Sequence, residues 1–302
     1  MERRDDRRRH FACRSTGARW EGAPAVRVID THAHLWRRSR TPQPWIDPAS
    51  MAVIDRDFWF EDLALMQRQS GIDGAVLVQS VNDTQESVDL LSLVDGRAVL
   101  GVIGWIDLEQ DVAAQLAALR EQPGGHRLLG IRHLAHLDLD PEWLLRPTVD
   151  LAALGDAGLP FDLVVRADQL GIAEHAVAAH PRTRFVLDHL GNPPLTSGDL
   201  AGWRHDLGSL ARHENVVVKL SGLTLQTDWS NWSVDDLREP VDVALDHFGP
   251  SRVMFGSDWP LVTLASDAPS WVDIVRELVP TALHDNVFGG TAERVYLEEH
   301  HA

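Results

Sequence analysis

The stretch RVIDTHAHL, residues 27–35, is a short apolar run that ends in polar side chains. Apolar runs of this length, rich in Val, Ile and Leu, are typical of buried strands. Seven later stretches follow the same pattern, and segments with helical periodicity lie between them. These stretches are DGAVLVQS (73–80), AVLGVIGWI (98–106), RLLGIRHLA (127–135), PFDLVVRA (160–167), TRFVLDHLG (183–191), NVVVKLSGL (215–223) and SRVMFGSDW (251–259).

The intervening segments have the spacing of amphipathic helices. Examples are FEDLALMQRQSG (60–71), DVAAQLAALREQ (111–122), QLGIAEHAVAAH (169–180), WRHDLGSLARHE (203–214) and LREPVDVALDHFG (237–249), and TAERVYLEEH (291–300) predicts one more, C-terminal helix. Eight strands alternating with helices over about 270 residues predict a (β/α)8 TIM barrel, whose usual length is about 250 residues. A doubly wound open sheet is the alternative, because the same alternation produces it.

Polar residues at the ends of the runs favour the barrel over the open sheet. The carboxyl ends carry His32, His34, Gln79, Trp105, Arg132, His133, Arg166, Asp188, His189, Lys219, Ser221 and Asp258. In a barrel these ends converge on one mouth, where the active site lies, whereas an open sheet would scatter them along an edge. We therefore expect one TIM-barrel domain over residues 27–302.

Composition and charge limit the class of partner. The formal charge is −17, and residues 1–27 hold eight Arg against four acidic residues, so the remainder, with 20 basic and 41 acidic side chains, carries −21. So acidic a body argues against nucleic-acid binding, and no stretch approaches the roughly 20 apolar residues of a membrane span. Residues 1–26 lack the apolar region of a signal peptide and are predicted to be a disordered extension. The single cysteine, Cys13, is consistent with the cytoplasm.

Two histidines near the end of the first run could bind a cation together. Alternate residues of a strand share a face, so His32 and His34 point the same way as Asp30. Neutral imidazole is a common zinc ligand, although an H-x-H triplet also occurs as a solvated strand end. His189 and Asp258 follow later strands and could meet the pair. Taken singly, His189 could be a buried, hydrogen-bonded histidine and Asp258 a turn residue.

Several motifs resemble the amidohydrolase superfamily. IDTHAHLW (29–36), GIRH (130–133), PFDLVVR (160–166), RFVLDHLGNPP (184–194), VVKLSGL (217–223) and RVMFGSDWP (252–260) have its order and spacing. The resemblance runs from about residue 28 to 296. It is strongest to the amidohydrolase-2 (amidohydrolase-related) family, in the branch of sugar-acid lactonases and 2-pyrone-4,6-dicarboxylate lactonase. This resemblance implies a distorted TIM barrel.

The resemblance also implies roles for site residues. His32 and His34 match the pair that binds a divalent metal in most of the superfamily, possible further ligands being His189 and Asp258. His189 matches a ligand or a contact of the substrate carbonyl, and Asp258 matches the aspartate that takes a proton from the attacking water. Where many relatives carry a bridging ligand on strand five, this chain has Arg166, a cation that would repel a second metal. We expect at most one metal, with Zn²⁺ as the candidate, and a metal-free mechanism as the alternative.

Lactone hydrolysis needs a positioned water, a base and an electrophile. Ionised Asp258 can serve as the base. The electrophile would be zinc on the histidine pair, or else His189 with an arginine. Arg132 and Arg166 could fork onto a substrate carboxylate or ring hydroxyls, or could simply form ion pairs at the rim. Trp36 and Trp259 could stack on a sugar-like ring, or could pack within loops.

The expected function is therefore that of a hydrolase acting on a small molecule, opening a sugar-acid lactone or a similar carboxylated lactone. A zinc-dependent decarboxylase of the same superfamily and a non-catalytic sugar-acid-binding barrel are the alternatives. No G-x-S-x-G motif is present, which argues against a serine hydrolase. Loops 36–57, 80–86 and 223–233 are expected to set specificity. The oligomeric state and the role of Lys219, the one lysine beside 27 arginines, stay open.

Overall fold

The eight predicted strands are present and form one parallel sheet. A computed structural model of the chain describes residues 27–298. The sheet order is β1 to β8 in sequence order, with every neighbouring pair parallel. The strands are β1 (Ile29–Ala33), β2 (Gly74–Val78), β3 (Val99–Gly104), β4 (Leu128–His133), β5 (Phe161–Leu163), β6 (Phe185–Leu187), β7 (Val216–Leu220) and β8 (Val253–Phe255).

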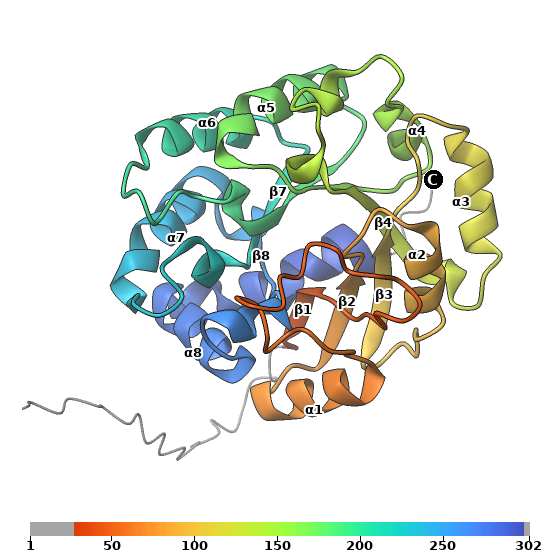
Figure 1. Cartoon of the computed structure of the whole chain (residues 1–302). Coiled ribbons are helices and arrows are strands. Elements are labelled where there is room, and N and C mark those ends of the chain that lie inside the picture. The colour runs from red at the N-terminus through yellow and green to blue at the C-terminus, as the bar shows by residue number, and fades with distance from the viewer. Residues whose placement is uncertain (1–26, 299–302) are drawn as a thin grey trace, which may run out of the picture.

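Helices follow the strands and surround them (Figure 1). They are α1 (Phe60–Ser70), α2 (Thr84–Leu91), α3 (Val112–Arg120), α4 (Leu151–Asp156), α5 (Leu170–Ala179), α6 (Ala201–Ala211), α7 (Val234–Phe248) and α8 (Ala268–Leu278). The predicted (β/α)8 barrel is thus confirmed, and the open sheet is not formed. The predicted N-terminal extension, residues 1–26, lies outside the described residues. Within residues 27–298, no helix is long and apolar enough to cross a membrane.

The barrel closes where β1 meets the segment after β8. Ala33 and Trp259 form a parallel bridge, and the His34 amide donates to the Trp259 carbonyl at 2.7 Å. The Asp258 amide in turn donates to the His32 carbonyl, also at 2.7 Å. These hydrogen bonds join the two backbones directly. Closure of the barrel and alignment of the His32, His34 and Asp258 side chains therefore depend on the same contacts.

A buried carboxylate reinforces this seam. Asp30 accepts hydrogen bonds from the Ser257 amide (2.8 Å) and hydroxyl (2.5 Å), and from the His32 amide (3.0 Å). Burial raises the pKa of Asp30 to about 6. Three donors offset part of the desolvation of this carboxyl group, which makes it a structural partner of the turn after β8.

Two apolar cores hold the barrel. The larger core packs the outer faces of the strands against the helices. The smaller core fills the barrel interior and includes Ile29, Val186 and Met254 from the strands together with Val295 and Tyr296 from the C-terminal segment. That segment was predicted as a helix over 291–300, and it winds as two π-helical turns, Asn286–Gly290 and Glu293–Leu297. The second turn packs Val295 and Tyr296 into the interior core, whereas Val287 and Phe288 of the first turn belong to the larger core.

Candidate active site

A cavity of about 740 Å³ lies at the carboxyl ends of the strands. Its floor holds side chains that the sequence singled out as chemical candidates, namely His34, Arg132, His189 and Asp258. The predicted specificity loops 36–57, 80–86 and 223–233 contribute Trp45, Met51, Ser80, Leu225 and Gln226 to its walls. Loops after β4, β5 and β6 contribute as well, through residues that include His136, Val164 and Asn192. The loop after β8 contributes Leu261, so the structure adds four loops to those predicted.

The two histidines of β1 meet on one face of the strand, as their spacing predicted. Their Nε2 atoms are 3.1 Å apart, and both side chains are buried. His34 Nδ1 lies 2.8 Å from the Val78 carbonyl. Because a carbonyl can only accept, Nδ1 of His34 carries its proton and Nε2 keeps a lone pair. Burial lowers the pKa of His34 and lowers that of His32 well below its usual value, so both rings are neutral at neutral pH.

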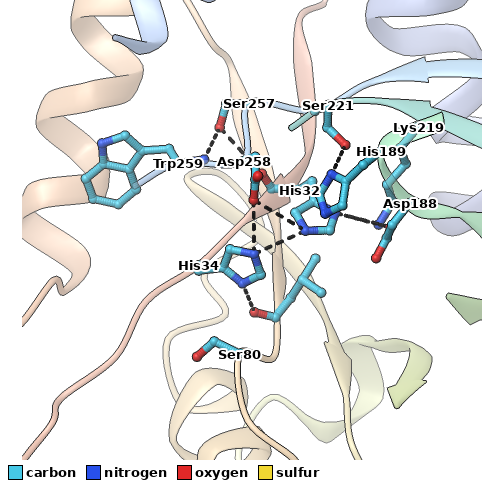
Figure 2. A network of polar contacts seen from close by, with 12 residues as sticks. His32, His34, Ser80, Asp188, His189, Lys219, Ser221, Ser257, Asp258 and Trp259 are labelled. Atoms are coloured by element: carbon cyan, nitrogen blue, oxygen red, sulfur yellow. Dashed lines mark hydrogen bonds and ion pairs between the residues drawn. The ribbon is translucent and has the colours of Figure 1, made fainter. Parts of the chain in front are cut away.

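Asp258 completes a three-residue cluster with this pair. Its Oδ1 lies 3.3 Å from His34 Nε2 and 3.7 Å from His32 Nε2 (Figure 2). That oxygen is buried and has no hydrogen-bond partner among residues 27–298. Two ligands of one tetrahedral zinc ion lie about 3.3 Å apart when the zinc–nitrogen bonds are 2.0–2.1 Å. The donor set, its spacing and the unpartnered carboxylate oxygen therefore fit one divalent metal ion.

Asp258 is held in a backbone conformation that costs energy. Its φ is +57°, in the left-handed region that residues other than glycine rarely adopt. β8 ends at Phe255, so this aspartate sits on a turn and not on the strand that was predicted to run to residue 259. The hydrogen bond from the Asp258 amide to the His32 carbonyl holds the turn in place. Strain of this kind is found where a side chain must be aimed at a site.

His189 is placed by a similar turn. β6 ends at Leu187, and His189 and Leu190 follow with φ values of +55° and +52°. The imidazole Nδ1 lies 2.9 Å from the Ser221 hydroxyl, which comes from the end of β7. The His189 and His32 rings lie 4.6 Å apart between centroids. Burial lowers the pKa of His189, so this ring too is neutral at the cavity floor.

Gly222 is the tightest point behind these side chains. Its φ is +64°, and a Cβ atom there would lie 2.4 Å from His189 Nδ1 and 3.0 Å from Asp258 Oδ2. Real Cβ atoms do not approach other atoms so closely. Gly222 lies within the VVKLSGL motif, but nothing in its sequence pattern marks it as a site residue. Only the arrangement in space shows why a side chain is excluded.

The two predicted substrate-binding arginines are largely occupied by the protein itself. Arg132 is buried, and it donates from Nη1 to Asp188 Oδ2 (3.0 Å) and from Nη2 to the Gln79 carbonyl. Arg166 donates from Nε to Asp168 (3.0 Å) and from Nη1 to the His136 carbonyl (2.9 Å). Both line the cavity, but neither offers an open fork to a carboxylate. Arg166 lies three residues beyond β5, so the predicted cation on strand five is not on that strand.

The buried cations near the histidines are Arg132 and Lys219. Lys219 on β7 is fully buried, and its Nζ lies 2.5 Å from Asp162 Oδ2 and 3.1 Å from Asp188 Oδ1. The hydroxyl of Tyr296 also donates to Asp162, at 2.8 Å. Composition alone left the role of Lys219 open. The sequence did contain a signal that Lys219 is buried, because this lysine alternates with apolar residues of a strand that is buried on both faces.

The predicted stacking platforms are not found at Trp36 and Trp259. Trp36 is fully buried, and its ring packs edge to face on Trp45 and Phe58. Trp259 is 6% exposed and packs on the same Phe58 ring. Neither residue is among the described residues that line the cavity. The two tryptophans belong to an aromatic cluster that holds the loop after β1 against the turn after β8.

We expect Trp36→Ala to lower the free energy of unfolding by about 3–5 kcal/mol, because it empties a large buried site. Denaturant unfolding of the purified variant measures this change. Leu139→Ala is the control, since Leu139 is fully exposed and its loss should change stability by less than about 0.5 kcal/mol. A Trp36→Ala protein of wild-type stability with a raised KM would restore the stacking role.

Comparisons with known proteins agree with this geometry. The amidohydrolase family model matches residues 29–297. An L-fucono-1,5-lactonase from Burkholderia multivorans is 36% identical over 89% of this chain and 95% of its own length. A second L-fucono-1,5-lactonase, from Burkholderia ambifaria, is 34% identical over 89% of this chain and 94% of its own. A solved amidohydrolase from Burkholderia multivorans with bound zinc has a TM-score of 0.82 and 33% identity, covering 89% of this chain and 99% of that one. The chain belongs to the amidohydrolase family.

Proposed function

We propose that this protein hydrolyses the lactone of a sugar acid, with Asp258 as the base. The observation that carries the proposal is the buried Asp258 Oδ1, which has no hydrogen-bond partner in the described part of the chain and lies at the floor of a cavity of about 740 Å³. The two L-fucono-1,5-lactonases among the relatives support a sugar-acid lactone as the substrate. A non-catalytic binding protein would have no need of a base held in a strained turn.

The reaction follows from the chemistry of a cyclic ester. Asp258 takes a proton from water while the water oxygen bonds to the lactone carbonyl carbon. The carbonyl oxygen becomes an oxyanion. When this tetrahedral species collapses, the bond between the carbonyl carbon and the ring oxygen breaks. The proton held by Asp258 passes to the ring oxygen, which leaves as a hydroxyl, and the product is the open hydroxy acid.

The protein supplies positive charge and a polar contact near the reacting carbonyl. Arg132 is a permanent cation at the cavity floor, and Asp188 and the Gln79 carbonyl fix its position. A preorganised donor in a buried site stabilises a developing oxyanion more strongly than water does. His189 is bound at Nδ1 by Ser221, which leaves Nε2 for the substrate. We assign Arg132 to the oxyanion and His189 to the carbonyl.

His32, His34 and Asp258 would hold one divalent metal ion, with Zn²⁺ as the candidate. When bound, such an ion would act as a Lewis acid on the carbonyl or on water. A second ion would have to share His32 with Asp188 and His189, the other cluster with suitable donors. Lys219 and Arg132 already contact Asp188, so two resident cations oppose it. We therefore retain one metal as the maximum, for a reason that differs from the expected charge of Arg166.

Polar groups on the cavity wall suit a sugar acid. Asn192 and Gln226 both line the cavity and are joined by a hydrogen bond of 2.9 Å from the Gln226 amide to Asn192 Oδ1. Side-chain amides both donate and accept, as ring hydroxyls do. We assign these two residues to the recognition of substrate hydroxyls.

The experiment that tests the function is an assay of proton release, with a pH indicator, on a panel of aldonolactones and 2-pyrone-4,6-dicarboxylate. We expect turnover of a sugar-acid lactone, L-fucono-1,5-lactone being the first to try. If folded protein releases no protons from any lactone and instead releases carbon dioxide from an aromatic acid, the proposal fails and the decarboxylase hypothesis replaces it.

The metal is tested separately from turnover. Purified protein incubated with Zn²⁺ and then desalted should retain close to one equivalent, measured by elemental analysis. The double variant His32→Ala and His34→Ala should retain none, because it removes two of the three donors. His205→Ala, a change in a helix far along the chain from these residues, is the control. Two retained equivalents, or retention by the double variant, would contradict the single site.

A further inference from the structure

One histidine on the wall of the cavity has no part in the proposed reaction. His136 lines the cavity from the loop after β4, within the short 3₁₀ turn Ala135–Leu137. Its Nδ1 is buried, and neither ring nitrogen has a hydrogen-bond partner within residues 27–298. Nε2 is the nitrogen that is not buried. The ring therefore offers a polar atom to the cavity that the described part of the chain does not use.

The backbone on both sides of this ring is fixed. The His136 amide donates to the Val164 carbonyl (3.1 Å), and the His136 carbonyl accepts from Arg166 Nη1 (2.9 Å). Gln169 Nε2 donates to the Ala135 carbonyl at 3.4 Å. These hydrogen bonds join the loop after β4 to the segment after β5. The imidazole is thus held in place before a ligand arrives, which lowers the cost of ordering it on binding.

His136 is a neutral imidazole at neutral pH. Burial, reinforced by the positive charge of Arg132, lowers the pKa of His136 to about 4. A neutral imidazole has one N–H donor and one lone pair. Either tautomer can form a hydrogen bond with a hydroxyl, because a hydroxyl both donates and accepts. A substrate hydroxyl is therefore a suitable partner for Nε2.

Packing alone does not account for a polar ring at this position. Leu134 and Leu137, two residues before His136 and one residue after it, line the same cavity with apolar side chains. A buried polar atom without a hydrogen bond destabilises a protein relative to an apolar atom of the same shape. Most buried polar atoms in folded proteins accordingly have a partner. A histidine without one, placed between two leucines on a cavity wall, points to a ligand as the partner.

The order of the strands indicates which part of a lactone faces His136. In a ring of eight strands in sequence order, β4 stands opposite β8. Asp258 follows β8 and gives its proton to the ring oxygen in the proposed reaction, so the ring oxygen lies toward β8. The carbonyl oxygen is assigned to Arg132 and His189. The remaining substituent of the carbonyl carbon is the α-carbon, which then lies toward β4 and His136.

We propose that His136 binds the hydroxyl on the α-carbon of the lactone and so selects α-hydroxylated lactones. The inference rests on the proposed lactonase function and adds to it a residue that determines specificity. Every aldonolactone derived from a common sugar acid carries this hydroxyl. Its hydrogen bond to His136 also fixes the neighbouring carbonyl against Arg132. The hydroxyls farther from the carbonyl remain assigned to Asn192 and Gln226.

The test compares two substrates that differ only in this hydroxyl, L-fucono-1,5-lactone and its 2-deoxy analogue. We expect His136→Leu to lower kcat/KM for the hydroxylated lactone by about tenfold and to leave that for the 2-deoxy lactone within about twofold. The intrinsic reactivities of the two lactones cancel, because each variant is assayed on both. His136→Gln should recover most of the preference, since its amide can reach the position of Nε2 and both donates and accepts.

Leu137→Ala is the matched control. It changes the same loop and the same cavity wall without removing a polar group, so any loss should be equal for the two lactones. Circular dichroism of each variant verifies the fold. Equal losses in His136→Leu would show a structural role and overturn the proposal, with the lactonase function intact.

Failure of the lactonase function has a different signature. In that case the wild type hydrolyses neither lactone, and calorimetric binding of the open acid L-fuconate and of its 2-deoxy analogue decides the role of His136. A loss of affinity for L-fuconate alone in His136→Leu would support the contact with the α-hydroxyl. Equal affinities in wild type and variant, or no binding by either, would overturn it.

Discussion

Asp258→Asn should lower kcat by about 10²–10⁴-fold, the usual contribution of a general base. The carboxylate oxygen Oδ1 is buried and lies at the cavity floor without a hydrogen-bond partner among residues 27–298, so it is available to a water molecule. Asparagine has nearly the same shape but cannot take a proton from water. The substitution keeps the hydrogen bond from the backbone amide of residue 258 to the His32 carbonyl, so the fold should be retained.

A second carboxylate on the same cavity provides the matched control. Asp168 lines the cavity too, but its side chain is 72% exposed and pairs with Arg166. Asp168→Asn should leave kcat within a few-fold of wild type. Steady-state kinetics on the lactone that the panel identifies, with circular dichroism of each variant, give the comparison. Near-normal turnover in folded Asp258→Asn protein would exclude Asp258 as the base.

The barrel and the centre of the site could be predicted because both depend on periodic patterns. Alternation along β1 places His32 and His34 on one face whatever the loops do, and the structure puts their Nε2 atoms 3.1 Å apart. The same rule places Arg132 toward the mouth and turns His133 away, where it stacks on Trp143 at 3.7 Å. Convergence of strand ends in a barrel then gathers residues from different strands without any knowledge of the loops.

The loops could not be predicted in the same way, because their side chains follow tertiary contacts and not a repeat. Trp36 was assigned to the substrate from its place just after a strand, yet the chain returns at Phe58 and buries it. Arg166 was placed on strand five, but β5 ends at Leu163 and the guanidinium turns to Asp168. His189 and Asp258 were placed on strands and lie on left-handed turns instead. In these cases the residue type pointed to a polar or aromatic residue near the barrel mouth, but the local backbone conformation could not be predicted from the sequence.

Buried partners were the least visible from sequence. Lys219 and Asp162 come from different strands and meet Tyr296, which comes from the C-terminal segment. No spacing rule links residues so far apart in the chain. A single lysine in a very arginine-rich protein could equally reflect codon or compositional bias. Its buried contacts with Asp162 and Asp188, and not its rarity, distinguish this lysine.

Gly222→Ala should lower kcat by about 10²-fold while costing only moderate stability. A Cβ atom at this position would lie 2.4 Å from His189 Nδ1 and 3.0 Å from Asp258 Oδ2, so the His189 ring must move. Movement also breaks its contact with the Ser221 hydroxyl, now 2.9 Å. A misplacement of about 1 Å at a catalytic centre can cost about 10²-fold in rate. The left-handed φ of +64° adds about 1–2 kcal/mol of backbone strain.

Gly71→Ala is the control that separates the effect of backbone strain from the effect of displacing the His189 ring. Gly71 has a similar φ of +68°, it ends α1, and a Cβ atom there would meet no atom of the described chain within 4 Å. Both variants therefore bear the same backbone penalty, and their losses of unfolding free energy should be similar apart from the local clash. Only Gly222→Ala should change turnover. If both alanine variants keep wild-type kcat, the His189 ring tolerates displacement and cannot be the contact that orients the substrate carbonyl. If only Gly222→Ala loses activity at comparable stability, the position of His189 is what the glycine protects.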